Sequence, residues 1–202
     1  MPKIVDHNEQ KQLVAEAAMR VIKREGLEHA SVRKIAVEAG ISAGSMRHYF
    51  STQHELFLFS MNRINEKVTE RISQLRFHGP IEQDVLNVLE QFLPLDEERF
   101  FEMEVWQAFT VKALTEKELQ PLKDEMYHSL RQVVHTCLIK LEEHTLLMDD
   151  VDIPLETERL YAIVNGIALH RIIQPNEMKP ELMRSILKLH LYTLMKKNVP
   201  PQ

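Results

Sequence analysis

The sequence predicts an all-α fold in two parts, with a small three-helix domain over residues 1–52 and a larger helical domain over residues 53–202. Two observations support this prediction. Hydrophobic residues make up 44% of the chain and only 5 of 202 residues are Gly, while the apolar residues recur at three- and four-residue steps rather than alternating. Between Ser31 and Phe50, two such segments are short and closely spaced, which is typical of a helix-turn-helix.

The first helix is expected from about Asn8 to Arg24. Gly26 follows it and can end a helix at little conformational cost. Lys11, near the start of the helix, is either a contact to a nucleic-acid backbone or an ordinary solvated side chain. The inward stripe of this helix is predicted to consist of Leu13, Ala17, Ala18, Val21 and Ile22.

The second helix is short and begins after Ser31, which is well placed as its N-cap. Ile35 and Ala36 are expected on its inner face, and Ala36 is small enough for another helix to cross closely. Gly40 then accepts the positive φ that ends the helix. These features predict a tight turn after residue 40.

The third helix is predicted at Ala43–Tyr49, with Ser42 as its N-cap. Met46 and Phe50 are expected to face the shared core. The outward face carries small residues followed by polar ones, so its backbone can approach a binding partner closely. This combination is typical of a helix that reads the major groove of DNA.

The stretch SVRKIAVEAGISAGSMRHYF, followed by STQHELF, resembles the DNA-binding domain of the tetracycline-repressor (TetR) family. Arg47 departs from the family pattern, because a Tyr that contacts phosphate is usual at that position. Gln53 departs from it as well, because Lys is common there. The positions that follow the pattern are Ser31, Ile35, Ala36, Ala39, Gly40, Ser42, Gly44, His48, Tyr49, Phe50, Glu55 and Leu56.

The resemblance implies a transcriptional regulator that binds double-stranded DNA through residues 1–52, with effector binding and dimerisation in residues 53–202. Ser31 either only caps the helix or also contacts a phosphate. Tyr49 has two equally expected roles, which are to support the core and to contact a backbone phosphate through its hydroxyl. The expected DNA-binding residues are Ser31, Val32, Arg33, Ser42, Ala43, Gly44, Ser45, Arg47, His48, Tyr49, Thr52 and Gln53.

The charge distribution agrees modestly with this interpretation. The whole chain has a formal net charge of −5. Residues 1–50 contain 8 Lys and Arg against 6 Asp and Glu, a net charge of +2, so positive charge is concentrated where DNA contact is expected.

The remaining chain reads as helices separated by Pro, Gly and polar residues. A long fourth helix is expected at about His54 to Leu75, and Thr52 with Glu55 has the spacing of a capping box at its start. The later helices are predicted at residues 81–93, 97–113, 118–144, 155–173 and 180–196.

The last two helices are expected to pair with their copies in a second subunit, because the resemblance implies a four-helix homodimer interface. The alternative is that they form only the core of a monomer. The interface residues expected from their apolar faces are Tyr161, Val164, Ala168, Leu182, Ile186 and Leu189.

The middle helices are expected to hold the site for an unknown small-molecule effector, although each candidate taken singly is equally a core residue. Glu102 and Trp106 lie one helical turn apart and together would suit a cationic ligand. The candidate residues are Phe92, Phe101, Glu102, Met103, Trp106, Phe109, Tyr127 and His170.

The sequence gives little support for catalysis, a metal or a cofactor. It contains 10 His residues, but no HExxH, GxSxG, P-loop or GxGxxG pattern. The single Cys, Cys137, lies among aliphatic residues and is interpreted as packing. The polar N-terminus and the lack of a long apolar run predict a cytoplasmic protein without a membrane segment.

These observations predict a homodimeric repressor that binds a palindromic operator and is released by an effector. Two alternatives remain open: a helical protein-interaction module that has lost specific DNA binding, and a helical ligand-binding protein or enzyme.

Overall fold

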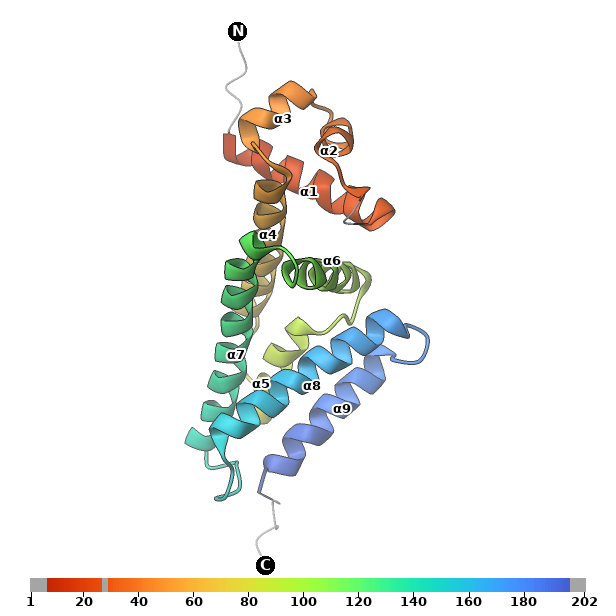
Figure 1. The fold of residues 1–202 in the computed structure, drawn as a ribbon. Helices are drawn as coiled ribbons and strands as arrows, with labels where there is room; N and C mark the ends of the chain where they lie inside the picture. Colours follow the sequence, from red (N-terminus) through yellow and green to blue (C-terminus); the bar gives the residue numbers. More distant parts are fainter. Residues whose placement is uncertain (1–6, 27–28, 197–202) are drawn as a thin grey trace, which may run out of the picture. The chain divides into compact units, whose positions relative to one another are not determined.

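The computed structural model describes residues 7–26 and 29–196, with side chains also omitted at residues 7, 8 and 53. Within these ranges the secondary structure is helical, apart from one isolated bridge between Leu147 and Met195. The α-helices are α1 (His7–Glu25), α2 (Val32–Glu38), α3 (Ala43–Tyr49), α4 (Gln53–Ser73), α5 (Ile81–Leu89), α6 (Glu97–Ala113), α7 (Gln120–Glu143), α8 (Ile153–Ile173) and α9 (Pro180–Leu194), joined by the short 3-10 turns η2 (Glu90–Phe92) and η3 (Lys117–Leu119) (Figure 1).

The contacts divide the chain into two units. The first comprises residues up to 67 together with 104–123, and the second comprises residues 68–103 together with those from 124 onward. Helices α4, α6 and α7 each begin in one unit and end in the other. The expected boundary after residue 52 does not coincide with this division and stays a prediction.

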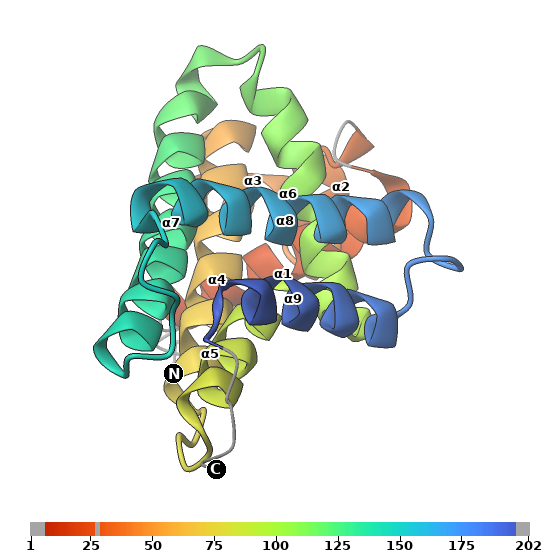
Figure 2. The same cartoon turned by 90° about the horizontal axis from the view of Figure 1, so that it is seen from below.

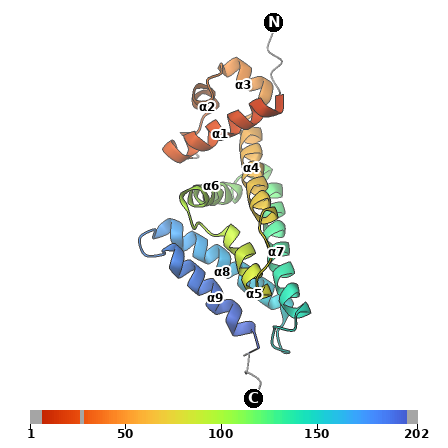
Figure 3. The same cartoon turned by 180° about the vertical axis from the view of Figure 1, so that it is seen from behind.

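The first unit contains a head in which α1, α2 and α3 pack on one another (Figures 1 and 3). Val14, Ile35 and Met46 are fully buried, one from each helix. The prediction that Leu13 faces inward is wrong, because its side chain is 53% exposed. The buried stripe instead begins at Val14, which lies one turn before Ala17 and Ala18 and therefore shares their face.

The two turns of the head use glycine as the sequence predicts. Gly26 has φ +82° after α1, and Gly40 has φ +69° after α2. The Ile41 N–H donates to the carbonyl of Ala36 over 3.0 Å, which closes the turn between α2 and α3. The predicted start and end of α3 are confirmed, as is the exact span of α6.

The second unit is built around a continuous apolar core from α5, α7, α8 and α9. Leu89, Leu138, Leu160 and Leu187 are fully buried members, one from each of these helices. Helices α8 and α9 run side by side in opposite directions, as Figure 2 shows. The helix predicted over 81–93 ends earlier as α5, and the tighter turn η2 completes it.

The ends of the longest helices differ from the predictions by at most two residues. Helix α4 spans Gln53–Ser73 and α7 spans Gln120–Glu143, preceded by η3. Helix α8 begins at Ile153, because the carboxylate of Asp152 accepts the Leu155 N–H over 3.1 Å and caps it. None of the helices in the described ranges is long and apolar enough to cross a membrane.

Candidate nucleic-acid interface

Helix α3 has only seven residues, so side chains at its ends must hold it in place. The hydroxyl of Ser42 accepts the Ser45 N–H over 3.0 Å and caps the helix. Met46 and Phe50 are buried in the head, 0% and 3% exposed, as the sequence predicts. These contacts fix which face of α3 points outward.

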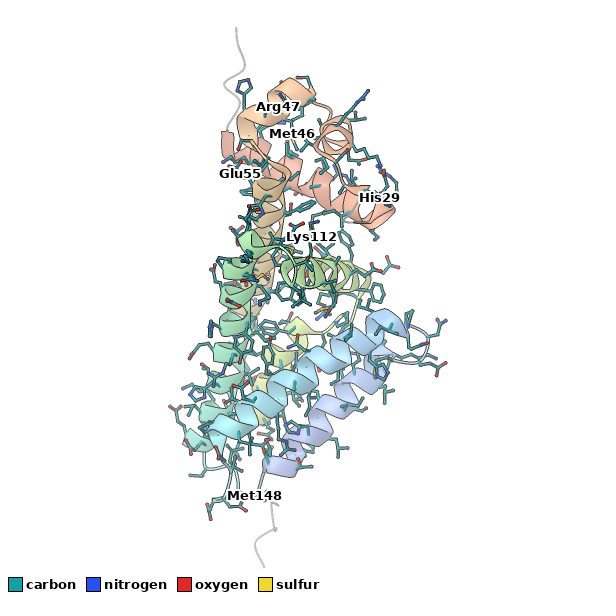
Figure 4. The ribbon with its side chains drawn as sticks, in the orientation of Figure 1. His29, Met46, Arg47, Glu55, Lys112 and Met148 are labelled. Atoms are coloured by element: carbon teal, nitrogen blue, oxygen red, sulfur yellow. The ribbon has the colours of Figure 1, made fainter. Side chains whose placement is uncertain are left out.

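The outward face of α3 carries small side chains at its start and larger polar side chains at its end. Arg47 is exposed, whereas Met46, its neighbour in sequence, lies inside the head (Figure 4). A Cβ added to Gly44 would meet only the Ser42 hydroxyl, at 3.7 Å, so the backbone there is open to a partner. The exposed residues of this face are Ala43, Gly44, Ser45, Arg47 and His48, with Ser42 at the cap.

The start of α2 also carries polar side chains. The hydroxyl of Ser31 accepts the Lys34 N–H over 3.4 Å, so its predicted capping role is confirmed. Arg33 is exposed and Val32 is half-buried. On α3, Tyr49 is also half-buried, which is compatible with both of its expected roles, core support and a hydroxyl contact to phosphate.

An ion-pair network links α1 to α2 and occupies three cations of the head. Glu38 accepts from Arg20 Nε and Arg24 Nη1, each over 2.9 Å. Glu25 accepts from Lys34 Nζ over 2.5 Å and from Arg24 Nη2 over 3.1 Å. Hydrogen bonds from Arg24 and then Arg20 lower the pKa of Glu38, and those from Lys34 and Arg24 lower that of Glu25.

Two arginines are left outside this network. Within the described part of the chain, neither Arg33 nor Arg47 forms an ion pair with a carboxylate. A cation already bound to a carboxylate offers little net charge to a phosphate, whereas an unpaired one can bind it directly. Arg33 on α2 and Arg47 on α3 are therefore available to bind phosphates or base edges.

The start of α4 is fixed by the predicted capping box. Thr52 Oγ1 accepts the Glu55 N–H over 3.0 Å, and the Glu55 carboxylate accepts the Ser51 N–H over 2.7 Å. The hydrogen bond from the Ser51 backbone lowers the pKa of Glu55. Thr52 is exposed, and the side chain of Gln53, also an expected contact, lies outside the described residues.

The expected effector residues differ in accessibility. Phe92, Phe101, Met103, Trp106 and Tyr127 are half-buried, while Phe109 is fully buried and His170 is exposed. Trp106 stacks on Phe109 with ring centroids 5.8 Å apart. Phe109 therefore packs in the core of the first unit, and its position gives no support to ligand contact.

The carboxylate of Glu102 is not available as the simple anchor for a cation that the sequence suggested. Arg71 donates to both of its oxygens, from Nη1 over 3.1 Å and from Nη2 over 2.8 Å. Glu102 is only 5% exposed. Sequence reasoning missed this arginine, because the two residues are 31 positions apart and nothing in the local pattern relates them.

The expected dimer residues fall into two groups. Val164 and Ala168 are buried within the chain itself, 1% and 0% exposed, because they face the core of the second unit. Leu182 and Leu189 are exposed, and Tyr161 and Ile186 are half-buried. Sequence reasoning missed the other exposed apolar residues on α8 and α9, which helical steps of three and four could have indicated, since Ile173 follows Leu169 by four and Tyr192 follows Leu189 by three. These residues are Leu155, Leu169, Ile173 and Tyr192.

No cluster of three or more His, Cys, Asp or Glu side chains suitable for a metal ion occurs among the described residues. Burial raises the pKa of the Cys137 thiol to about 12. A thiol in that state is a poor nucleophile, which agrees with its interpretation as packing.

Comparison with protein families gives two matches that together cover most of the chain. Residues 14–58 match the family described as bacterial regulatory proteins, tetR family. Residues 81–196 match the family described as BetI-type transcriptional repressor, C-terminal. The first match covers the head from the middle of α1 onward and the second covers α5 to α9.

Individual proteins are similar over nearly the whole length. The HTH-type transcriptional regulator PksA of Bacillus subtilis is 39% identical over 196 residues, covering 96% of this chain and 94% of that protein. The crystal structure of a transcriptional regulator from Rhodococcus sp. is 30% identical, with a TM-score of 0.80 over 91% of this chain and 95% of that one. A regulator from Saccharomonospora viridis, crystallised with choline, shares the fold with a TM-score of 0.85 at 18% identity, covering 94% of this chain and 100% of that one.

Proposed function

The chain belongs to the TetR family of bacterial transcriptional regulators, and from this premise we propose that it is a repressor that binds a palindromic operator as a homodimer. The family consists of DNA-binding regulators rather than enzymes. We further propose that a small-molecule effector, bound outside the head, releases the DNA. Such a regulator acts on the genome, so we place it in the cytoplasm.

The observation that carries this proposal is the outward face of α3. A capped short helix with Ala43, Gly44 and Ser45 at its start can bring its backbone close to base edges, and Ala43 can contact a thymine methyl group. Arg47 follows with an exposed guanidinium that has no ion pair among the described residues, and Arg33 adds a second one from α2. We propose that Ser31, His48, Tyr49 and Thr52 bind phosphates around this face.

The homodimer is proposed because one head reads too few base pairs for specific binding, and two heads double both the contacts and the charge. Exposed apolar side chains on α8 and α9 support a partner on this face. Gly166 on α8 has open space where a Cβ would lie, so a second helix could approach closely. We propose an interface formed by Leu155, Ala162, Leu169 and Ile173 of α8 with Leu182, Ile186, Leu189 and Tyr192 of α9.

The effector site is proposed among half-buried apolar residues of the second unit, namely Phe92, Phe101 and Met103. Half-buried aromatic and Met side chains are the usual lining of small-molecule sites. Trp106, the single tryptophan of the chain, lies one turn beyond Glu102 on α6 and provides a fluorescence signal for ligand titrations.

The function is tested by selecting DNA fragments that the purified protein binds and sequencing them. We expect a palindrome with half-sites about 34–36 Å apart, one helical turn or a multiple of it. If Arg33 and Arg47 of both heads bind phosphates, four contacts are made, so a plot of log Kobs against log[salt] should have a slope of about −3.6 or steeper. Weak, salt-sensitive binding without a recovered sequence would instead favour the interaction module.

A further inference from the structure

Two helices that have residues in both units are joined by a partly buried ion pair close to the unit boundary in each helix. Helix α4 enters the second unit at residue 68, and Arg71 lies three residues further. Helix α6 leaves that unit after residue 103, and Glu102 lies directly before. Arg71 and Glu102 both belong to the second unit, and three residues separate the end of α3 from the start of α4.

The geometry of the pair is bidentate. Both terminal nitrogens of Arg71 donate to the two oxygens of Glu102, over 3.1 and 2.8 Å. The side chain of Arg71 is 24% exposed and that of Glu102 is 6% exposed. Arg71 Nε is buried and has no hydrogen-bond partner among the described residues, so the guanidinium is held by the bonds of its two terminal nitrogens to Glu102.

A pair of this kind responds to displacement differently from an apolar contact. Aliphatic side chains tolerate sliding, whereas two parallel hydrogen bonds between charged planar groups are lost together when one helix shifts. Replacing a buried ion pair by apolar residues is often neutral or favourable for stability, so stability alone is a weak explanation for its presence. The pair constrains the position of α4 along α6 more sharply than packing would.

We propose that the Arg71–Glu102 pair is a positioning contact that holds α4 in the orientation from which the head binds the operator. This inference rests on the proposed DNA-binding function. Breaking the pair is expected to lower operator affinity while the chain stays folded. Arg71 and Glu102 are positioning residues, because they act through α4 rather than by touching DNA.

The test uses the full-length protein and the operator recovered by selection. Glu102→Gln keeps the shape of the side chain and removes its charge, and Arg71→Met removes the donor. Each should raise the operator Kd about tenfold or more, within the usual range of coupling between sites. Both also leave a buried group without its partner, so a loss of stability accompanies them.

The double variant Arg71→Met/Glu102→Met separates positioning from stability. It removes both charges, so its thermal unfolding should return to or exceed that of the wild type, while its operator Kd should stay raised about tenfold. Arg184→Met is a matched control, because Arg184 binds Glu90 over 3.2 Å between α9 and η2, at a more exposed site. The control should leave operator affinity unchanged.

Wild-type operator affinity in the double variant would overturn the inference and reduce the pair to a structural contact. An equal loss of affinity in Arg184→Met would overturn it as well, because any ion pair of the second unit would then suffice. Failure of the wild-type protein to bind any duplex would overturn the proposed function first, and the inference with it.

Discussion

At the scale of single residues, the head separates cations that hold its own helices from cations that remain for DNA. Arg20, Arg24 and Lys34 are bound by Glu25 and Glu38. The three cations are exposed and the two carboxylates are half-buried, so the network contributes little to stability. It does, however, leave these three cations less able to bind phosphate. Counting Lys and Arg in the sequence therefore overstates the charge that the head can offer.

Arg47→Ala should raise the operator Kd at least about tenfold, because a guanidinium on a base edge or phosphate contributes about 1–3 kcal/mol. The thermal unfolding temperature should not change, since the side chain is exposed. Fluorescence anisotropy with labelled operator measures the first quantity and calorimetry the second.

Arg20→Ala is the matched control for Arg47. Its guanidinium is also exposed in the head but is bound by Glu38, so its loss should change the operator Kd by less than about threefold. Equal losses in the two variants would show that the head binds DNA by general charge and not through α3.

Cys137 gives a prediction about pH. Burial raises its thiol pKa from the ordinary 9.0 to about 12, so the folded thiol stays protonated while the unfolded one ionises. The unfolded state then binds fewer protons, so this contribution to stability is fully present below pH 9 and is lost as the pH rises toward 12.

Urea unfolding of the wild type and Cys137→Ala at pH 8 and pH 10 measures this effect. The stability advantage of the wild type should be smaller at pH 10. An advantage that does not change with pH would mean that the folded thiol ionises like the unfolded one. Iodoacetamide at pH 8 should modify Cys137 only after unfolding, because the folded thiol is buried and protonated.

At the scale of helices, the sequence predicted best what depends on neighbours in the chain. The bounds of α3 followed from Ser42 as cap and from Met46 and Phe50 as inward residues, all within nine positions. The predicted positive φ of Gly40 is likewise local. The wrong orientation of Leu13 has a different origin, because apolar residues at 13 and 14 fit overlapping stripes and only the packing of α2 and α3 decides between them.

Features that depend on contacts between distant segments could not be predicted. The partner of Glu102 lies on another helix, and the burial of Val164 and Ala168 depends on how α8 packs in its own unit. The exposure of the candidate DNA-binding residues was easier to predict, because the periodicity of a short capped helix shows which of its side chains face outward. The specific DNA contacts stay predictions.

Gly44→Ala should separate the stability of α3 from its function. Gly44 lies in the helix with no strained φ, and a Cβ there meets only Ser42 Oγ at 3.7 Å, so Ala should stabilise the fold by up to about 1 kcal/mol. The same methyl group would stand between the α3 backbone and DNA, so operator affinity should fall.

Gly40→Ala is the matching control in the adjacent turn. Its φ of +69° disfavours Ala, so this variant should lose about 1 kcal/mol of stability, although no atom blocks the Cβ. Chemical denaturation and operator titration of both variants measure these effects. Unchanged affinity in a stabilised Gly44→Ala protein would show that the α3 backbone does not approach the groove closely.

At the scale of the whole molecule, the second unit has an apolar face that the single chain does not cover. Leu155, Leu169 and Ile173 on α8 and Leu182, Leu189 and Tyr192 on α9 are between 41% and 67% exposed. Six large apolar side chains exposed on two adjacent helices indicate an interaction surface. Two copies joined there would bring two heads to one operator.

Leu189→Glu should convert the protein to a monomer, because a charge at the most exposed apolar residue of α9 would be buried without a partner in the dimer. Sedimentation equilibrium gives the mass, and the operator Kd should rise at least about a hundredfold as one of two half-site contacts is lost. Val111→Glu is the matched control, since Val111 is 65% exposed on α6 in the first unit, and this variant should leave the dimer intact.

If Leu189→Glu stayed dimeric, the interface would lie on another face. If it became monomeric but bound the operator as the wild type does, a single head would suffice for recognition, and the effector could not act by changing the spacing of two heads.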